Sequence, residues 1–161
     1  MNHAPGTPTP PQAALDDFDL RVRRHVYRHF VERGRAPALE EIARALGAGQ
    51  GEVERSLRRL HDAHALVLEQ GAPAIRMAHP FSAVETRHRV RSAGRWWHAN
   101  CAWDAFGIPA ALGVDGHVSS RCACCDEPID IDVVDRLPVQ GESVVHVLLP
   151  ARRWWEDIVF T

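Results

Sequence analysis

Apolar residues recur every three or four positions in the first part of the chain, which is the spacing of one face of an α-helix. One stripe ends before Gly34, a second covers Leu39–Leu46, and a third lies within residues 50–64. The stripes consist of Leu15, Phe18, Val22, Val26 and Phe30, then Leu39, Ile42, Ala43 and Leu46, then Val53, Leu57 and Leu60. The pattern predicts three consecutive helices.

Two short apolar runs, residues 66–68 and 75–77, follow the third stripe and predict a β-hairpin with its turn at Gln70 to Pro73. Three helices and a hairpin are typical of a winged helix-turn-helix, which we assign to residues 15–78. Residues 1–14 are rich in proline and have no periodicity, so we expect a flexible tail there.

The pattern changes after residue 78. A short helix is expected over residues 95–106, with a break near Gly107 and Pro109. Alternating or continuous apolar runs predict strands at residues 117–120, 129–133 and 143–149. The prediction is therefore an α+β protein: a winged-helix-like domain followed by a small mixed α/β core on an antiparallel sheet, over residues 79–161.

Composition and charge narrow the function. The 161 residues carry a net charge of −2, without the basic excess typical of nucleic-acid-binding domains. All 19 basic residues are arginine, so no lysine is available as a nucleophile. The sequence has neither an apolar run of the ~18 residues that a membrane span needs nor the pattern of a secretory signal. We expect a cytoplasmic protein with no membrane partner.

The predicted third helix argues against DNA as a partner. This helix reads the major groove in winged-helix proteins, where phosphate contacts supply much of the affinity. Here its basic residues are balanced by acidic ones: Arg55, Arg58 and Arg59 against Glu52, Glu54 and Asp62. A structural or partner-docking role is therefore favoured for this domain.

Cys101 and Asp104 are spaced to share one face of a helix. A carboxylate does not activate a thiol, because the two negative charges raise each other's pKa. The pair makes chemical sense when a soft metal binds the sulfur and the carboxylate moves a proton beside it. The alternative is a buried cysteine beside an aspartate that caps the helix or pairs with an arginine.

Three more cysteines form the pattern Cys122-x-Cys124-Cys125. Cys122 and Cys125 have the spacing of half a structural zinc site, which Cys101 and His117 could complete, although nothing in the sequence requires zinc. Cys124 and Cys125 could instead bind a soft cation such as Hg(II), or merely pack in a turn.

Tryptophans lie close to Cys101 in the sequence. Trp96 and Trp103 would form an apolar binding surface for an organic group if they line a pocket beside the thiol. The alternative is that they belong to the core, as tryptophans more often do.

Residues 100–131, NCAWDAFGIPAALGVDGHVSSRCACCDEPIDI, resemble the active-site region of the organomercurial (alkylmercury) lyases. The shared motifs are Cys-Ala-x-Asp at residues 101–104, a Pro-Ala-Leu-x-Gly-like stretch at 109–113 with one extra residue, and Val-Ser-Ser-x-Cys at 118–122. Members of this family also carry a winged-helix-like domain before the catalytic core.

The resemblance implies cleavage of the carbon–mercury bond of R–Hg⁺. In this family two thiolates bind the mercury and an aspartate delivers a proton to carbon, which gives R–H and Hg(II). Carried over, Cys101 is the first thiol, Asp104 the proton carrier and Cys122 a structural cysteine. No cofactor is required, Hg(II) is the bound product, and cellular thiols or a mercuric reductase accept it.

The chain departs from the family at the second catalytic thiol, because no cysteine follows Cys125. Three explanations stay open: a C-terminally truncated product, substitution by Cys124 or Cys125, or an inactive relative that binds or senses heavy metals through its thiols. One thiol activates mercury less, so only weak lyase activity is expected unless a substitute thiol reaches the site.

Overall fold

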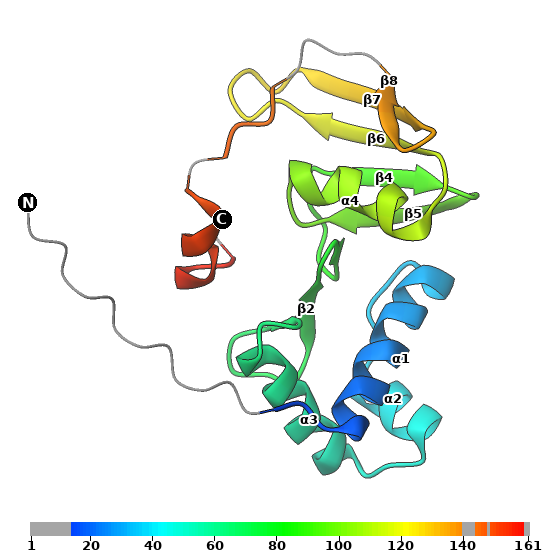
Figure 1. Ribbon diagram of the computed structural model, residues 1–161, viewed down its shortest axis with the longest axis vertical. Helices are drawn as coiled ribbons and strands as arrows, with labels where there is room; N and C mark the ends of the chain where they lie inside the picture. The colour runs from blue at the N-terminus through cyan, green and yellow to red at the C-terminus, as the bar shows by residue number, and fades with distance from the viewer. Residues whose placement is uncertain (1–13, 140–143, 148, 160–161) are drawn as a thin grey trace, which may run out of the picture.

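The computed structural model describes residues 14–139, 144–147 and 149–159, so most of the predicted tail, residues 1–14, lies outside it. The three predicted helices are present as α1 (Asp17–Arg33), α2 (Leu39–Leu46) and α3 (Gln50–Asp62), and they form the lower part of the molecule in Figure 1. No helix in the described ranges is long and apolar enough to cross a membrane.

Helix α1 is fixed at both ends. A capping box starts it, with the Asp19 backbone N–H donating to the Asp16 side chain and the Asp16 N–H donating to Asp19. Gly34 ends it in the left-handed region at φ 72°. A side chain here would also place its Cβ 2.9 Å from the Trp96 carbonyl oxygen on the sheet, so only glycine fits this approach.

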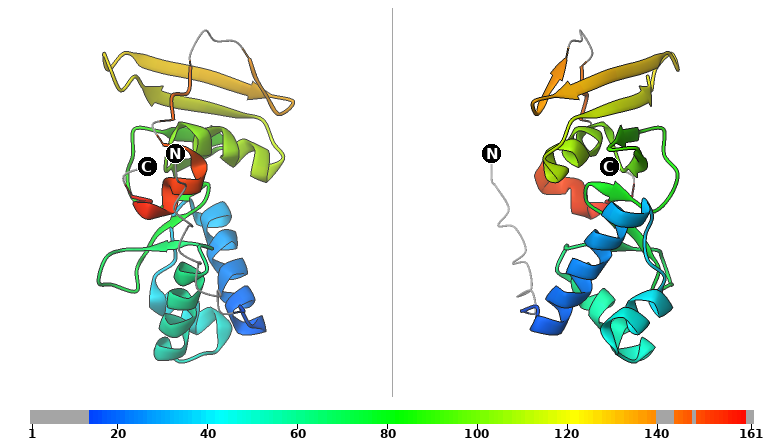
Figure 2. Two further views of the ribbon diagram at one scale, coloured as in Figure 1. Left: turned by 60° about the vertical axis from the view of Figure 1, so that its left-hand side comes forward. Right: turned by 90° about the vertical axis from the view of Figure 1, so that its right-hand side faces the viewer.

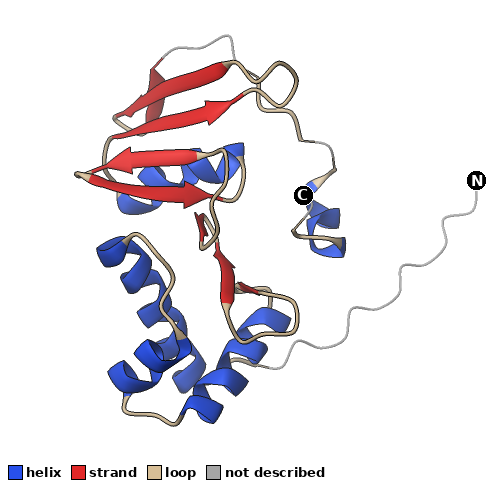
Figure 3. Cartoon of the chain, turned by 180° about the vertical axis from the view of Figure 1, so that it is seen from behind, coloured by secondary structure: helices blue, strands red, loops and turns tan. Residues whose placement is uncertain are grey.

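The eight strands within the described residues belong to one antiparallel sheet with the order β1-β2-β3-β5-β4-β6-β7-β8. Their bounds are Val67–Leu68, Ile75–Ala78, Phe81–Ser82, Arg89–Ser92, Arg95–Ala99, Gly116–Arg121, Pro128–Val134 and Leu137–Val139 for β1 to β8. The hairpin β1–β2 is the predicted wing, and β3 joins it to the rest of the sheet (Figure 3). The structure thus confirms the α+β class, and the sheet runs across the predicted domain boundary at residue 78.

Helix α4 (Ala102–Leu112) packs against strands β4, β5 and β6 (Figure 2). Its buried residues Ala105 and Ile108 join the same core cluster as Val90, Trp97 and other buried residues of the sheet. The Trp97 indole N–H donates to the Phe30 carbonyl oxygen at 2.7 Å, which ties this core to α1. The helical part and the sheet therefore share one hydrophobic core.

The predicted helix over residues 95–106 is wrong in its first half and too short at its end. Residues 95–99 form β5, because Trp97 and Ala99 alternate toward the core and the strand pairs with β3 and β4. The helix then continues through Gly107 and Pro109 to Leu112. Ile108 and Pro109 are buried against the sheet, and this packing outweighs the one hydrogen bond that proline removes.

The strands predicted at 117–120 and 129–133 are confirmed as parts of β6 and β7. The strand predicted at 143–149 is not: residues 144–147 have no regular structure, while 143 and 148 lie outside the described residues. Val144 is 87% exposed, so this run lacks the burial that would favour a strand. After it, the short 3₁₀-helix η1 (Ala151–Glu156) lies at the left of the view in Figure 1, between the levels of β6 and α3.

Candidate functional site

Cys101 and Asp104 meet at the N-terminus of α4. Cys101 is the N-cap residue, and its sulfur accepts a hydrogen bond from the Asp104 backbone N–H at 3.5 Å. Burial raises the pKa of the Cys101 thiol above its usual value; the Asp104 charge and the hydrogen bond between thiol and carboxylate also raise it, outweighing the backbone N–H groups that lower it. The Cys101 thiol is therefore protonated in the free protein, and it lies beside a carboxylate that can accept the proton.

Two side chains hold the Asp104 carboxylate in place. The Asn100 amide donates to Oδ2 at 2.9 Å, and the His79 ring nitrogen Nδ1 lies 3.3 Å from the same oxygen. Asn100 also donates to the Pro80 and Phe81 carbonyl oxygens, so its amide is fixed by backbone. The Asp104 side chain is only 14% exposed, and it is thus oriented rather than free to rotate in solvent.

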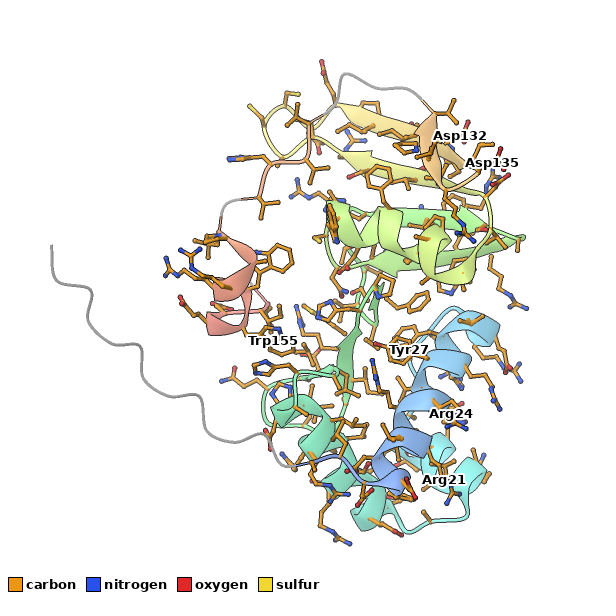
Figure 4. The ribbon with its side chains drawn as sticks, in the orientation of Figure 1. Arg21, Arg24, Tyr27, Asp132, Asp135 and Trp155 are labelled. Carbon is orange, nitrogen blue, oxygen red and sulfur yellow. The ribbon has the colours of Figure 1, made fainter. Side chains whose placement is uncertain are left out.

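His79 is positioned from two sides. The Tyr27 hydroxyl on α1 donates to the His79 carbonyl oxygen at 3.0 Å, and Figure 4 shows Tyr27 on the side of α1 that faces the strands. The Trp155 ring of η1 meets the His79 ring edge-on at 6.2 Å and stacks on His64 at 3.9 Å. The last described helix therefore packs beside the residues that hold Asp104.

The register of the sheet places His88 between Ala99 and Ser120. The row that crosses β5, β4 and β6 contains Ala99, His88 and Ser120: the Ala99 N–H donates to the His88 carbonyl oxygen, and Ser120 Oγ lies 2.8 Å from His88 Nδ1. Burial and the Arg87 charge lower the pKa of His88, although the Asp104 charge opposes them. Cys101 and Cys122 thus follow their strands at the same end of the sheet, two strand spacings or roughly 10 Å apart.

The three later cysteines share the turn between β6 and β7. The Cys122 sulfur accepts the Cys124 N–H at 3.5 Å, and hydrogen bonds from the Cys125 and Cys124 backbone and the Cys125 thiol lower the pKa of Cys122. Cys124 and Cys125 are exposed. The resemblance implied a structural role for Cys122, and that role stays a prediction.

His117, the other zinc ligand considered, lies at the opposite end of β6 from Cys122. Its ring nitrogens are 2.7 Å from Asp132 and 3.2 Å from Asp130, and the two residues are separated by about 16 Å of extended strand. His117 therefore cannot complete a site with Cys122. Among the described residues, no group of three or more His, Cys, Asp or Glu side chains is arranged to hold a metal.

The two predicted pocket tryptophans do not lie together. Trp96 faces away from the core, where Arg89 stacks on its ring at 4.5 Å and Arg91 lies at 5.7 Å. The alternation of β5 puts it on the sheet face opposite Trp97 and α4, so the predicted role of Trp96 beside Cys101 is wrong. Trp103 is the second residue of α4 and is 67% exposed; its role as a pocket residue stays a prediction.

Two of the three arginines of α3 form ion pairs within the fold, and the third, Arg55, is exposed. Arg59 donates to the buried Asp19 carboxylate at 2.6 Å and 2.9 Å, and Ser56 donates to the same group. Arg58 pairs with Glu54 at 2.7 Å. These pairs link α3 to α1 or neutralise part of its surface. That DNA is not a partner stays a prediction.

Comparison with known proteins identifies the family of the chain. The alkylmercury lyase family model matches residues 81–161, which are 81 of the 161 residues. The chain belongs to the alkylmercury lyase family. A search of curated proteins finds no match.

A solved structure from the same family shares the fold. The crystal structure of the mercury-bound form of MerB2 superposes with a TM-score of 0.63 at 23% sequence identity. The match covers 78% of this chain and 60% of MerB2, so the chain spans less than two thirds of the length of MerB2.

Sequence reasoning missed His79, Asn100 and His88. Asn100 directly precedes the cysteine of the family motif, which is a signal for a neighbouring polar group. His79 and His88 reach the site only through the pairing of β3, β4 and β5, so no local pattern marks them.

Proposed function

We propose that the chain cleaves the carbon–mercury bond of organomercurials by protonolysis. The observation that carries this proposal is the pair of Cys101 and Asp104: the Cys101 sulfur accepts the Asp104 backbone N–H, and Asn100 and His79 hold the Asp104 carboxylate in place. A soft thiolate suits mercury, and an oriented acid suits proton transfer to carbon.

The reaction balances with Cys101 as the one essential thiol. For a substrate R–Hg–X, with X a thiolate from the medium, the Cys101 sulfur binds mercury and its proton passes to Asp104. Asp104 then protonates the carbon as the carbon–mercury bond breaks. The electron pair of the carbon–mercury bond becomes the new C–H bond. The products are R–H and Cys101–S–Hg–X, without change of oxidation state at mercury.

A second protein thiolate would weaken the carbon–mercury bond further. Cys124 and Cys125 are the sequence's candidates for this ligand, and both are exposed on the turn at the Cys101 end of the sheet. Cellular thiols or a mercuric reductase would then remove Hg(II). Zinc has no assigned role in this scheme.

The test separates mercury binding from bond cleavage. We expect Asp104→Asn to form a phenylmercury adduct on Cys101, seen as a mass increase by native mass spectrometry, but to release at least about 100-fold less benzene. Asp130→Asn, which changes an exposed carboxylate remote from Cys101, is the control and retains the wild-type rate. Benzene release by Asp104→Asn at the wild-type rate would overturn the proposal.

A further inference from the structure

The turn between β6 and β7 is held by backbone hydrogen bonds and an ion pair. The Cys122 N–H donates to the Glu127 carbonyl oxygen at 2.8 Å, the Asp126 N–H donates to the Cys122 carbonyl oxygen at 3.0 Å, and Arg121 pairs with Asp126 at 2.9 Å. These bonds fix the backbone from residue 121 to residue 127. The cysteines of this turn, Cys122, Cys124 and Cys125, therefore lie on a loop with a fixed backbone.

Within this loop the Cys122 sulfur accepts the Cys124 backbone N–H at 3.5 Å. Hydrogen bonding from the neighbouring cysteines lowers the pKa of the Cys122 thiol, because amide donors stabilise a thiolate. The bonded turn holds Cys122 and Cys125 on one short loop. The sequence spacing of two intervening residues is that of paired thiolate ligands.

We propose that Cys122 and Cys125 form a two-thiolate site for a soft cation, Hg(II). Among the described residues no third His, Cys, Asp or Glu is arranged with them, which disfavours a four-ligand zinc site. A pair of sulfurs suits a thiophilic ion that accepts two ligands. Cys124 is exposed on the same turn, and its sulfur is not needed for the pair.

The position of the pair suggests its use. Cys122 continues the alternation of Val118 and Ser120, which face α4, and it lies at the Cys101 end of the sheet. We assign the pair the role of accepting Hg(II), the inorganic product of cleavage. This role rests on the proposed function. A thiol HX of the medium first displaces Cys101 from mercury, which restores the Cys101 thiol and gives X–Hg–X, and the Cys122 thiolate then replaces one X as X⁻. Cys125 then gives up its proton and displaces X as HX, so the exchange balances without an oxidant or reductant.

Binding is tested independently of cleavage in a Cys101→Ser/Cys124→Ser background, which leaves only Cys122 and Cys125 as thiols. The reduced protein is loaded with HgCl₂, challenged with about 1 mM glutathione, a concentration comparable to the effective concentration of closely linked ligands, and examined by native mass spectrometry. We expect one retained Hg(II) per chain. A further Cys125→Ala change, on the exposed part of the turn, is expected to weaken retention roughly tenfold or more.

Circular dichroism shows whether each variant is folded. Equal retention with and without Cys125, or no retention by the folded protein that keeps both cysteines, would overturn this proposal. Neither outcome bears on carbon–mercury cleavage, because that reaction is measured by benzene release from the chain that keeps Cys101.

Discussion

Removing the hydrogen bonds to Asp104 should slow proton transfer without weakening mercury binding. The sharpest perturbation is His79→Leu, compared with His79→Asn, because an asparagine amide nitrogen can occupy the position of Nδ1. In the structure, Nδ1 lies 3.3 Å from Asp104 Oδ2, and the carboxylate is mostly buried. A hydrogen bond to a charged group contributes about 1.5–3 kcal/mol.

If that interaction operates fully in the transition state, kcat falls roughly 10- to 150-fold, since 1.36 kcal/mol corresponds to a factor of ten. The remaining bond from Asn100, at 2.9 Å, places the expectation for His79→Leu near the lower end of that range. KM for phenylmercury should stay within about twofold of the wild-type value, because Cys101 supplies the mercury ligand.

The assay is benzene release from phenylmercury acetate in excess thiol, with kcat and KM determined separately. We expect His79→Asn to recover most of the rate that His79→Leu loses. A loss confined to KM, or an equal loss in both variants with the fold intact, would refute the reasoning that His79 acts through Asp104.

Two further predictions concern reactivity and stability. Because burial raises the pKa of Cys101 while hydrogen bonds lower that of Cys122, iodoacetamide should modify Cys122 first at neutral pH, and Cys101 only as the pH rises above about 9; peptide mass spectrometry gives the order, and the reverse order would contradict it. Trp155→Ala should lower the free energy of unfolding by about 0.5–1.5 kcal/mol beyond the loss of buried area, because the ring stacks on His64. Trp103→Ala, at a 67% exposed position, should change it by less than about 0.5 kcal/mol in the same urea titration, and equal effects would count against the packing of η1.

Much of the fold could be predicted from periodicity alone. The stripes that contain Val22, Ile42 and Leu57 identified α1, α2 and α3, because their buried faces have strict helical spacing. The tryptophans before Cys101 misled the prediction, since a strand at Arg95–Ala99 and a helix have similar short apolar patterns. Ala93 and Gly94 form the turn of the hairpin that ends in this strand, with φ values of 46° and 75°. Positive φ values at both positions are typical of a tight hairpin turn.

The site could be predicted only in part. Cys101 and Asp104 are neighbours along one helix, so their spacing was enough to bring them together. His79 and Asn100 meet Asp104 because β3 and β5 are paired, which is long-range information. The misassignment of Trp96 has the same cause, because which sheet face a residue occupies depends on strand register.

The most direct measurement is benzene release from phenylmercury by the wild-type chain and by Cys101→Ser in excess thiol. We expect slow benzene release from the folded wild type and none above the protein-free rate from Cys101→Ser. Folded wild type that releases no benzene, or an unchanged rate in Cys101→Ser, would contradict the assignment of Cys101 as the thiol that binds the substrate.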